Sequence, residues 1–331
     1  TKTAEAWAWR SRGTHERAQD DGATLTDRVQ SLEKAARQRW TASSVHAKAD
    51  GAKQRARLAK WRVQRRLNES LSPTPGLLAG DLDAVLGADR VVLLAEYALS
   101  GALRPEALSG AAGWAAAGVP TLVVSARDAW SRSAPPPADL PDGVAVVSRP
   151  NVGYDFGSWG AALAAYPELA AKRLVILTND SLAGPYGPLD DLLARIEAST
   201  SDVWAATQNH APHDHLQSYL LAFRGGVLGR EPLRSFFGGV RAQESKRDVV
   251  QTYEFGLSAQ VEEHGLTYDV GWTKEDLQIS PTTDSILGAW PRMLSGGFPF
   301  VKRTLLEQRR FDHLHDSIAT VVRQEYGAEL R

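Results

Sequence analysis

The sequence predicts an α/β protein in which helices cover both faces of a mostly parallel sheet. Apolar runs of strand length alternate with Ala- and Leu-rich segments of helical length, a pattern typical of parallel strands buried on both sides. The pattern begins after Pro73-Thr-Pro-Gly76, the clearest structure breaker in the chain. A turn rich in small residues at 149–159 leads into a helix, and the apolar run 174–177 ends near a carboxylate. This order predicts a site for a phosphorylated ligand at the carboxyl ends of the strands.

The elements follow one another in a regular order. The predicted strands are 90–95, 120–125, 144–149, 173–178, 203–208 and 218–223. The predicted helices are about 104–117, 158–171 and 187–198, with a helical pattern from about 246 and a final helix over roughly 302–325. The Pro-rich stretch 134–141 is expected to be a connecting loop.

Composition limits the classes of function. Hydrophobic residues make up 43% and charged residues 23% of the 331 positions, which is ordinary for a soluble globular protein. The formal net charge of −1 creates no global field that would recruit nucleic acid, so we expect no nucleic-acid partner. The absence of cysteine excludes disulfides, thiolate zinc sites and cysteine nucleophiles, and it permits the cytoplasmic location that we expect.

Residues 1–72 are expected to form a separate helical, basic extension, and residues 73–331 the main domain. The extension is rich in Ala, Arg, Lys, Glu and Gln and poor in Gly and Pro, which favours helix. Within it, residues 48–67 place Leu58 and Trp61 among many cations, as in an amphipathic helix lying on the inner face of the cell membrane. A solvated helix that packs one stripe on a partner, or on the body of the protein, explains the same pattern.

Five short motifs occur in one order between about residues 90 and 305. They are Asn151-Val-Gly-Tyr-Asp155, Leu177-Thr-Asn-Asp-Ser181 with Gly184-Pro185, His215-Leu-Gln-Ser-Tyr219, Tyr253-Glu-Phe-Gly-Leu257 and Phe298-Pro-Phe-Val-Lys302. Together they resemble the rhamnan synthesis protein F family, glycosyltransferases of bacterial cell-surface polysaccharide assembly. The resemblance implies a GT-A-like (Rossmann-like) fold. It also implies transfer of rhamnose or another deoxyhexose from a nucleotide-diphosphate donor to a polysaccharide, glycan or lipid-linked glycan.

Asp180 is the candidate metal ligand. A transferase of this kind must neutralise the charge of a departing diphosphate, usually with Mg²⁺ or Mn²⁺ held by one or two carboxylates. The resemblance implies that Asp180 occupies the place of the metal-binding acidic motif, although Asn179 leaves only one carboxylate there. Asn179 and Ser181 are then expected to contact the donor. In the alternative interpretation, Asn179 and Asp180 cap the helix near Pro188 or shape a turn.

Asn151, Gly153 and Asp155 are expected to form a second part of the donor site. Glycine allows the backbone to approach a ligand closely or to adopt positive φ. A carboxylate at 155 has the chemistry to bind a ribose or a base edge, or to form an ion pair within the site. The alternative is that Asp155 or Ser158 caps the following helix.

The stretch 209–218 contains three histidines, His210, His213 and His215. By residue type alone they could form the metal cluster of a hydrolase. However, the segment has no helical spacing of metal ligands, and it contains a proline. The resemblance instead implies that His215, Gln217 and Ser218 face the donor.

Glu254 is the candidate general base. It opens an amphipathic helix, and the resemblance implies that this carboxylate takes the proton of the acceptor hydroxyl in an inverting reaction. The alternative is a favourable charge near a helix N-terminus. Lys302 either reaches the diphosphate or starts the terminal helix as a solvated side chain.

These observations favour an inverting, metal-assisted glycosyltransferase. A noncatalytic glycan-binding or scaffold domain of a polysaccharide synthesis complex is the second interpretation, supported by Asn179 and the basic extension. A metal-dependent hydrolase built on the histidine cluster is the third. The first interpretation requires that residues 151–155, Asp180 and Glu254 converge at one edge of the sheet.

Overall fold

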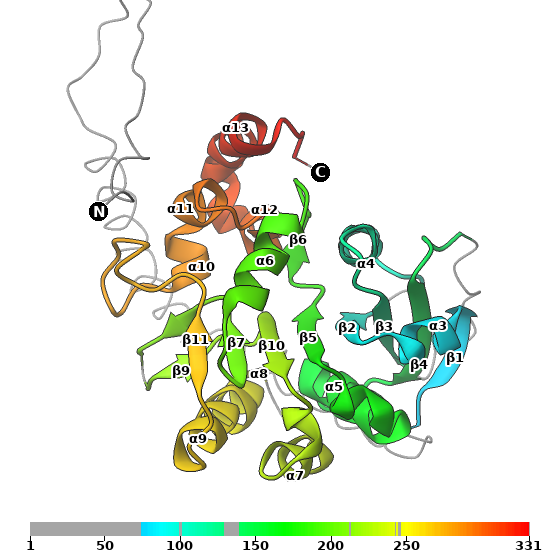
Figure 1. Cartoon of the computed structure of the whole chain (residues 1–331). Helices are drawn as coiled ribbons and strands as arrows, with labels where there is room; N and C mark the ends of the chain where they lie inside the picture. The colour runs from blue at the N-terminus through cyan, green and yellow to red at the C-terminus, as the bar shows by residue number, and fades with distance from the viewer. Residues whose placement is uncertain are drawn as a thin grey trace, which may run out of the picture. The chain divides into compact units, whose positions relative to one another are not determined.

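A computed structural model describes residues 74–98, 101–128, 139–211, 213–241, 243 and 246–330. They build an eight-stranded sheet in the order β1-β4-β3-β2-β5-β10-β7-β11, with helices packed against it (Figure 1). The α/β class is therefore confirmed. The predicted helices of residues 1–72 and the basic stretch 48–67 lie outside the described residues.

Four neighbouring strands form the parallel part of the sheet. They are β4 (Val144–Pro150), β3 (Thr121–Arg127), β2 (Arg90–Tyr97) and β5 (Leu174–Asn179). Each matches a predicted apolar run to within a few residues. Parallel pairing requires crossover connections, and α4 (Pro105–Ala116) and α5 (Tyr154–Ala165) supply two of them, after β2 and β4.

The rest of the sheet is mixed, so the prediction of a mostly parallel sheet was only partly right. The edge strand β1 (Gly76–Gly80) pairs antiparallel with β4. In the same way, β10 (Leu220–Arg224) lies antiparallel between β5 and β7 (Val203–Ala205), and β11 (Tyr268–Val270) is parallel to β7. The chain passes from β7 to β10 through only the small strands β8 (Gln208–Asn209) and β9 (His215–Leu216). Without a crossover helix, the chain returns in the opposite direction.

Two hydrophobic clusters lie on the two faces of the sheet, because alternate strand residues point to opposite sides. On one face, strand residues such as Leu93 and Leu177 join the buried residues of the first set of helices. That set is α3 (Leu82–Gly87), α5, α7 (Leu233–Gly238) and α9 (Phe255–Glu263). On the other face, Leu94 and Ile176 join the buried residues of the second set. That set is α4, α6 (Asp190–Ala198), α10 (Ser285–Gly288) and α11 (Trp290–Ser295).

The C-terminal segment differs from the single helix predicted over 302–325. Val301 and Lys302 form β12, which pairs with β6 (Leu182–Ala183), so the chain is extended where the helix was expected to start. It continues through α12 (Arg303–Glu307), η6 (Arg309–Leu314) and α13 (His315–Tyr326). Gln308 separates α12 from η6 with an extended backbone at φ −95° and ψ 121°. This segment packs with α11 into a third hydrophobic cluster.

Smaller differences have local causes. The helix expected at 158–171 begins earlier, at Tyr154, and gives way to η3 (Pro167–Ala171) where proline removes a backbone donor. The pattern from 246 is helical, through α8 (Lys246–Val249), the π-helical turn η5 (Val250–Glu254) and α9. No helix in the described part of the chain is long and apolar enough to cross a membrane.

Candidate functional site

The chain order places a topological switch point between β2 and β5. From β2 the chain moves outward through β3 and β4, and it then returns to the other side of β2 as β5. Ligands of open α/β sheets bind at the carboxyl ends of strands at such a point. Asp180 lies there, directly after β5. Its backbone N–H donates to the Ala95 carbonyl at 3.0 Å, and its Oδ2 accepts from the Tyr97 N–H at 3.3 Å.

Two arginines from distant segments pair with Asp180. Arg104 Nε, just before α4, lies 3.3 Å from Asp180 Oδ2, and Arg303 Nη1, at the start of α12, lies 3.5 Å from the same oxygen. Arg303 Nη1 also donates to the Asp180 carbonyl at 2.5 Å. The Asp180 side chain is 13% exposed, so this carboxylate is largely enclosed by its cationic partners.

The predicted donor-site residues next to Asp180 form a chain of hydrogen bonds. Asn179 Nδ2 donates to Asp155 Oδ2 at 2.8 Å, and Asn179 Oδ1 accepts from the backbone N–H and the hydroxyl of Ser181. Lys302 Nζ donates to Ser181 Oγ at 2.7 Å and lies 4.9 Å from the centre of the Tyr219 ring. The structure thus brings together three distant parts of the sequence: Asp155, the pair Asn179 and Ser181, and Lys302.

Two structural roles were considered for Asn179 and Asp180, a helix cap and a turn. The N-cap of α6 is Leu189, with no side-chain capping bond, so neither residue caps that helix. The bond from the Ser181 N–H to the Asn179 side chain is instead an Asx turn, as the turn interpretation expected.

The loop before α5 is held in shape by Arg149. This buried guanidinium donates to Ser158 Oγ at 3.1 Å and to the Val152 carbonyl at 2.5 Å, and burial lowers its pKa to about 10. Gly153 stands at the N-cap with a left-handed φ of +79° and no side-chain cap. The capping alternative is therefore wrong for Asp155 and Ser158, whose recorded partners are Asn179 and Arg149.

The ends of β2, β3 and β4 are linked by polar contacts. Tyr97 Oη donates to Asp128 Oδ2 at 2.6 Å, and Asn151 Nδ2 donates to Asp128 Oδ1 at 3.3 Å. Asp128 was not among the predicted residues. Its position one residue beyond an apolar strand is the signal that could have found it, since it is the same signal that singled out Asp180.

Glu96 is a buried carboxyl group beside the switch point. Its residue is 1% exposed, and Ser125 Oγ donates to Glu96 Oε2 at 2.8 Å. Burial raises the pKa of Glu96 to about 7, the charge of Asp180 adds to the rise, and hydrogen bonds from Ser125 and the Arg104 backbone oppose it. The predicted strand ended at Ala95, so Glu96 stood one residue beyond it in the sequence and was not among the predicted site residues.

Glu254 contacts Ser218, which lies near the carboxyl end of β5. The Ser218 hydroxyl donates a short hydrogen bond to Glu254 Oε1. Leu220 pairs with Thr178, so Ser218, two residues earlier, lies near the turn that carries Asp180. Helical structure runs on both sides of Glu254, from α8 through η5 to α9, so its charge does not face a free helix N-terminus. A single π-helical turn of this kind is frequent at functional sites.

The histidine side chains turn to different partners. His210 Nδ1 lies 2.8 Å from Asp214 Oδ1, whereas His215 Nδ1 lies 2.7 Å from the His213 carbonyl. The His215 ring is buried and packs 4.6 Å from that of Phe255. Over the described ranges, no three His, Cys, Asp or Glu side chains are placed to hold a metal. The geometry therefore gives the hydrolase interpretation no support.

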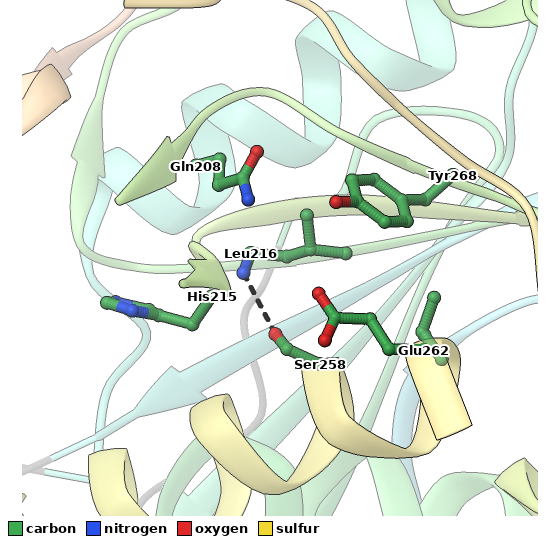
Figure 2. Close-up of a pocket in the computed structure, with 7 residues that line it drawn as sticks. Gln208, His215, Leu216, Ser258, Glu262 and Tyr268 are labelled. Carbon is green, nitrogen blue, oxygen red and sulfur yellow. Dashed lines mark hydrogen bonds between the residues drawn. The ribbon is translucent and has the colours of Figure 1, made fainter. Parts of the chain in front are cut away.

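His215 also borders a small hollow on the surface of α9. Its lining residues are Gln208, His215, Leu216, Ser258, Val261, Glu262 and Tyr268. Figure 2 shows the His215 ring directed away from Glu262 and Tyr268, and Ser258 bonded to the Leu216 backbone at 2.9 Å. About 170 Å³ of space lies in this hollow, and that figure includes open solvent, so the enclosed space is far below the roughly 300–1,000 Å³ of ligand pockets. This hollow is too small for a nucleotide sugar.

Both ends of the Gln217 side-chain amide contact protein groups. Its Oε1 accepts from Thr207 at 2.6 Å, and its Nε2 donates to Asp284 Oδ2 at 3.3 Å. Asn209 also donates to Asp284, at 3.1 Å, and the buried Lys274 donates to Asn209 at 2.8 Å. This polar network supports the segment that carries Ser218.

Comparison with known proteins identifies the chain's family. The family model for rhamnan synthesis protein F matches residues 138–330, more than half of the chain. This protein belongs to that family. The match covers β4, β5, β10 and every predicted site residue. A family named for rhamnan synthesis indicates a role in polysaccharide synthesis.

Two curated relatives from Vibrio anguillarum show the same distant similarity. Both are named virulence protein VirA, and each is 24% identical to this chain over 192 residues. The alignment covers 48% of this chain and 61% of each relative, so the chain spans about three fifths of the length of these proteins.

The donor atoms at the switch point fit a divalent cation poorly. Mg²⁺ and Mn²⁺ prefer several oxygen ligands, usually carboxylates and waters. Here Asp180 is the one carboxylate directly after β5, and its Oδ2 is already contacted by the Tyr97 N–H and by two guanidinium groups. The expected metal remains a prediction.

Proposed function

We propose that this member of the rhamnan synthesis protein F family is an inverting glycosyltransferase with a GT-A-like fold. Its donor is a nucleotide-diphosphate sugar, rhamnose or another deoxyhexose, and its acceptor a cell-surface polysaccharide or a free or lipid-linked glycan. The observation that supports the proposal is that polar groups from β2, the first turn of α5, the end of β5 and β12 meet beside the switch point, with the Ser218–Glu254 pair just before β10. Nucleotide ligands bind at this place in open α/β sheets.

The donor site is assigned to the hydrogen-bonded residues beside β5. Asp155, Asn179 and Ser181 offer carboxylate, amide and hydroxyl groups for the ribose and the phosphates, and Asn151 extends this row toward β4. Gly153, at the N-cap of α5, supplies the left-handed φ of +79° that leads the chain into this helix, and it is buried against Val240. His215, through Nδ1, and Gln217, through its amide, also hold the segment around Ser218 in place beside the donor.

Glu254 is assigned as the general base. Its carboxylate takes the acceptor hydroxyl proton while the acceptor oxygen bonds to the anomeric carbon. The bond between that carbon and the diphosphate oxygen breaks from the opposite face, and the nucleoside diphosphate leaves with the electron pair. Ser218 orients the carboxylate through one oxygen, Oε1, and the Ser258 hydroxyl holds the local helix by donating to the Glu254 carbonyl at 3.0 Å.

The test combines donor binding with transfer. The purified chain is titrated with uridine, guanosine and deoxythymidine diphosphate sugars, and release of nucleoside diphosphate is followed with a polysaccharide acceptor. We expect Glu254→Gln to bind the donor with unchanged affinity and to transfer about 10²–10⁴-fold more slowly. Glu263→Gln, an exposed carboxylate on the same helix, is the matched control and should react like wild type.

Two results would contradict the assignment. Wild-type transfer by Glu254→Gln would remove Glu254 from the mechanism. Failure of every nucleotide sugar to bind would favour the noncatalytic scaffold, which has no use for a donor. Contact of residues 48–67 with the inner face of the membrane stays a prediction of the sequence; we propose to test it by binding of the chain to anionic vesicles.

A further inference from the structure

We propose that Arg104, Lys302 and Arg303 form a cationic clamp that holds the donor diphosphate and neutralises it as it leaves, in the place where a divalent metal was expected. This inference rests on the proposed transferase function. It assigns the chemistry of phosphate binding to side chains of this protein.

The three cations come from two distant parts of the chain and meet at one turn. Arg104 lies between β2 and α4, while Lys302 and Arg303 lie at the junction of β12 and α12. All three contact the two residues that follow β5. Arg104 and Arg303 contact Asp180, and Lys302 contacts Ser181. The Arg303 backbone N–H also donates to the Ser181 carbonyl at 2.8 Å, which keeps the junction against the turn.

The arginines keep donors available for an anion. A guanidinium carries five N–H donors, and it binds phosphate well through two parallel hydrogen bonds. The side chain of Arg104 contacts Asp180 Oδ2 and the Tyr97 carbonyl, in both cases through Nε. Arg303 meets Asp180 through Nη1, with Nε 2.8 Å from Glu307 Oε1. Among the residues that the structure describes, Nη1 and Nη2 of Arg104 and Nη2 of Arg303 have no hydrogen-bond or ion-pair partner.

Positive charges outnumber the enclosed negative charge of Asp180 at the clamp, which favours binding of an anion. Asp180 is shared by both arginines, and the buried Glu96 is a second acidic group beside Arg104. Glu307 lies beside Arg303 but is 51% exposed, where solvent screens its charge. Asp180 therefore acts as a positioning residue that orients the guanidinium groups. A preorganised set of cations stabilises the charge that develops on the leaving diphosphate oxygen.

The clamp and a metal site predict opposite results in chelator. Inorganic pyrophosphate is the probe, because it has the diphosphate chemistry without a base or sugar, and binding is measured by calorimetry in EDTA. The clamp predicts that pyrophosphate binds wild type in EDTA, with affinity falling as salt rises. It also predicts a loss of tenfold or more in Lys302→Met and Arg104→Met. Arg309→Met, an exposed arginine on η6, is the matched control and should bind like wild type.

Asp180→Asn gives the sharpest contrast. The clamp predicts that this variant still binds pyrophosphate in EDTA, because the asparagine amide oxygen can accept from the two guanidinium groups and keep them oriented, while the negative charge that repels the anion is removed. A metal ligand predicts loss of binding. Lys302→Met leaves the Asp180 ion pairs intact, and a melting temperature close to wild type shows that its loss of affinity is not unfolding.

The outcomes separate this inference from the proposed function. Binding that requires Mn²⁺ or Mg²⁺ and disappears in EDTA overturns the clamp and leaves a transferase. Wild-type affinity for pyrophosphate in Arg104→Met and Lys302→Met overturns the clamp as well. Failure of all nucleotide sugars to bind overturns the transferase itself.

Discussion

Replacement of Glu96 by glutamine should remove a pH-dependent cost from the folded protein. Glu96 is 1% exposed at the end of β2, with Ser125 donating to one carboxyl oxygen. Arg127 and Arg104 favour the ionised form of Glu96, whereas the negative charge of Asp180 disfavours it. Burial outweighs these contacts and favours the neutral acid. Glutamine has the same shape and is always neutral.

The magnitude follows from the rise in pKa. Burial lifts the pKa of Glu96 from 4.5 to about 7. At about 1.4 kcal/mol per pKa unit, the shift corresponds to about 3 kcal/mol. The sign follows from the raised value. Below about pH 4.5 the carboxyl is neutral in both states. As pH rises toward 7 the unfolded chain releases its proton first, so folding stability falls and the cost is complete above the folded pKa.

The assay is urea unfolding of wild type and Glu96→Gln between about pH 4 and pH 8. The other groups titrate equally in both proteins, so the difference in unfolding free energy isolates Glu96. We expect the two proteins to be nearly equal near pH 4 and the variant to gain about 3 kcal/mol over wild type by pH 8. Glu263→Gln should show no such trend, since its side chain is exposed. A constant difference across the whole range would refute the reasoning.

Two further predictions concern packing around the site. Gly157→Ala should lower the unfolding free energy by about 1–3 kcal/mol, because a Cβ there would stand 2.0 Å from the Val152 carbonyl oxygen. Gly87→Ala, where a Cβ meets nothing within 4 Å, is the control in the same urea titration, and equal losses would contradict the clash. Trp159→Phe should cost about 1–3 kcal/mol, because the buried indole N–H donates to the Leu93 and Thr178 carbonyls at 3.2 Å. Unchanged unfolding of this variant would show that the bridge between β2 and β5 is not needed.

Local patterns were enough for the parallel strands and for part of the site. The strands β2 to β5 appear in the sequence as apolar runs with breakers beside them, because strands buried on both faces need apolar side chains throughout. Asn179, Asp180 and Ser181 were found because they follow such a run, and Asp155 because it follows a glycine turn. The local order of apolar and polar residues is enough to predict where such a strand ends.

The contacts of those residues were not readable in the same way. Arg104 and Arg303 reach Asp180 across 76 and 123 positions of sequence, and neither stands in a local pattern that marks it. The histidine cluster failed for the opposite reason. His210 and His215 are close together in the sequence, but their side chains contact different partners.

Amino-acid order alone settled the alternation of buried strands and helices and the polar groups at the strand ends, since both depend on residues close together in the chain. Strand direction and charge pairing depended on the fold. The absence of a crossover helix before β10 made the sheet mixed, and packing of α4 and α12 at the switch point surrounded Asp180 with arginine. Hydrophobic periodicity records which face of a segment is buried and carries no information about which distant side chain meets it there.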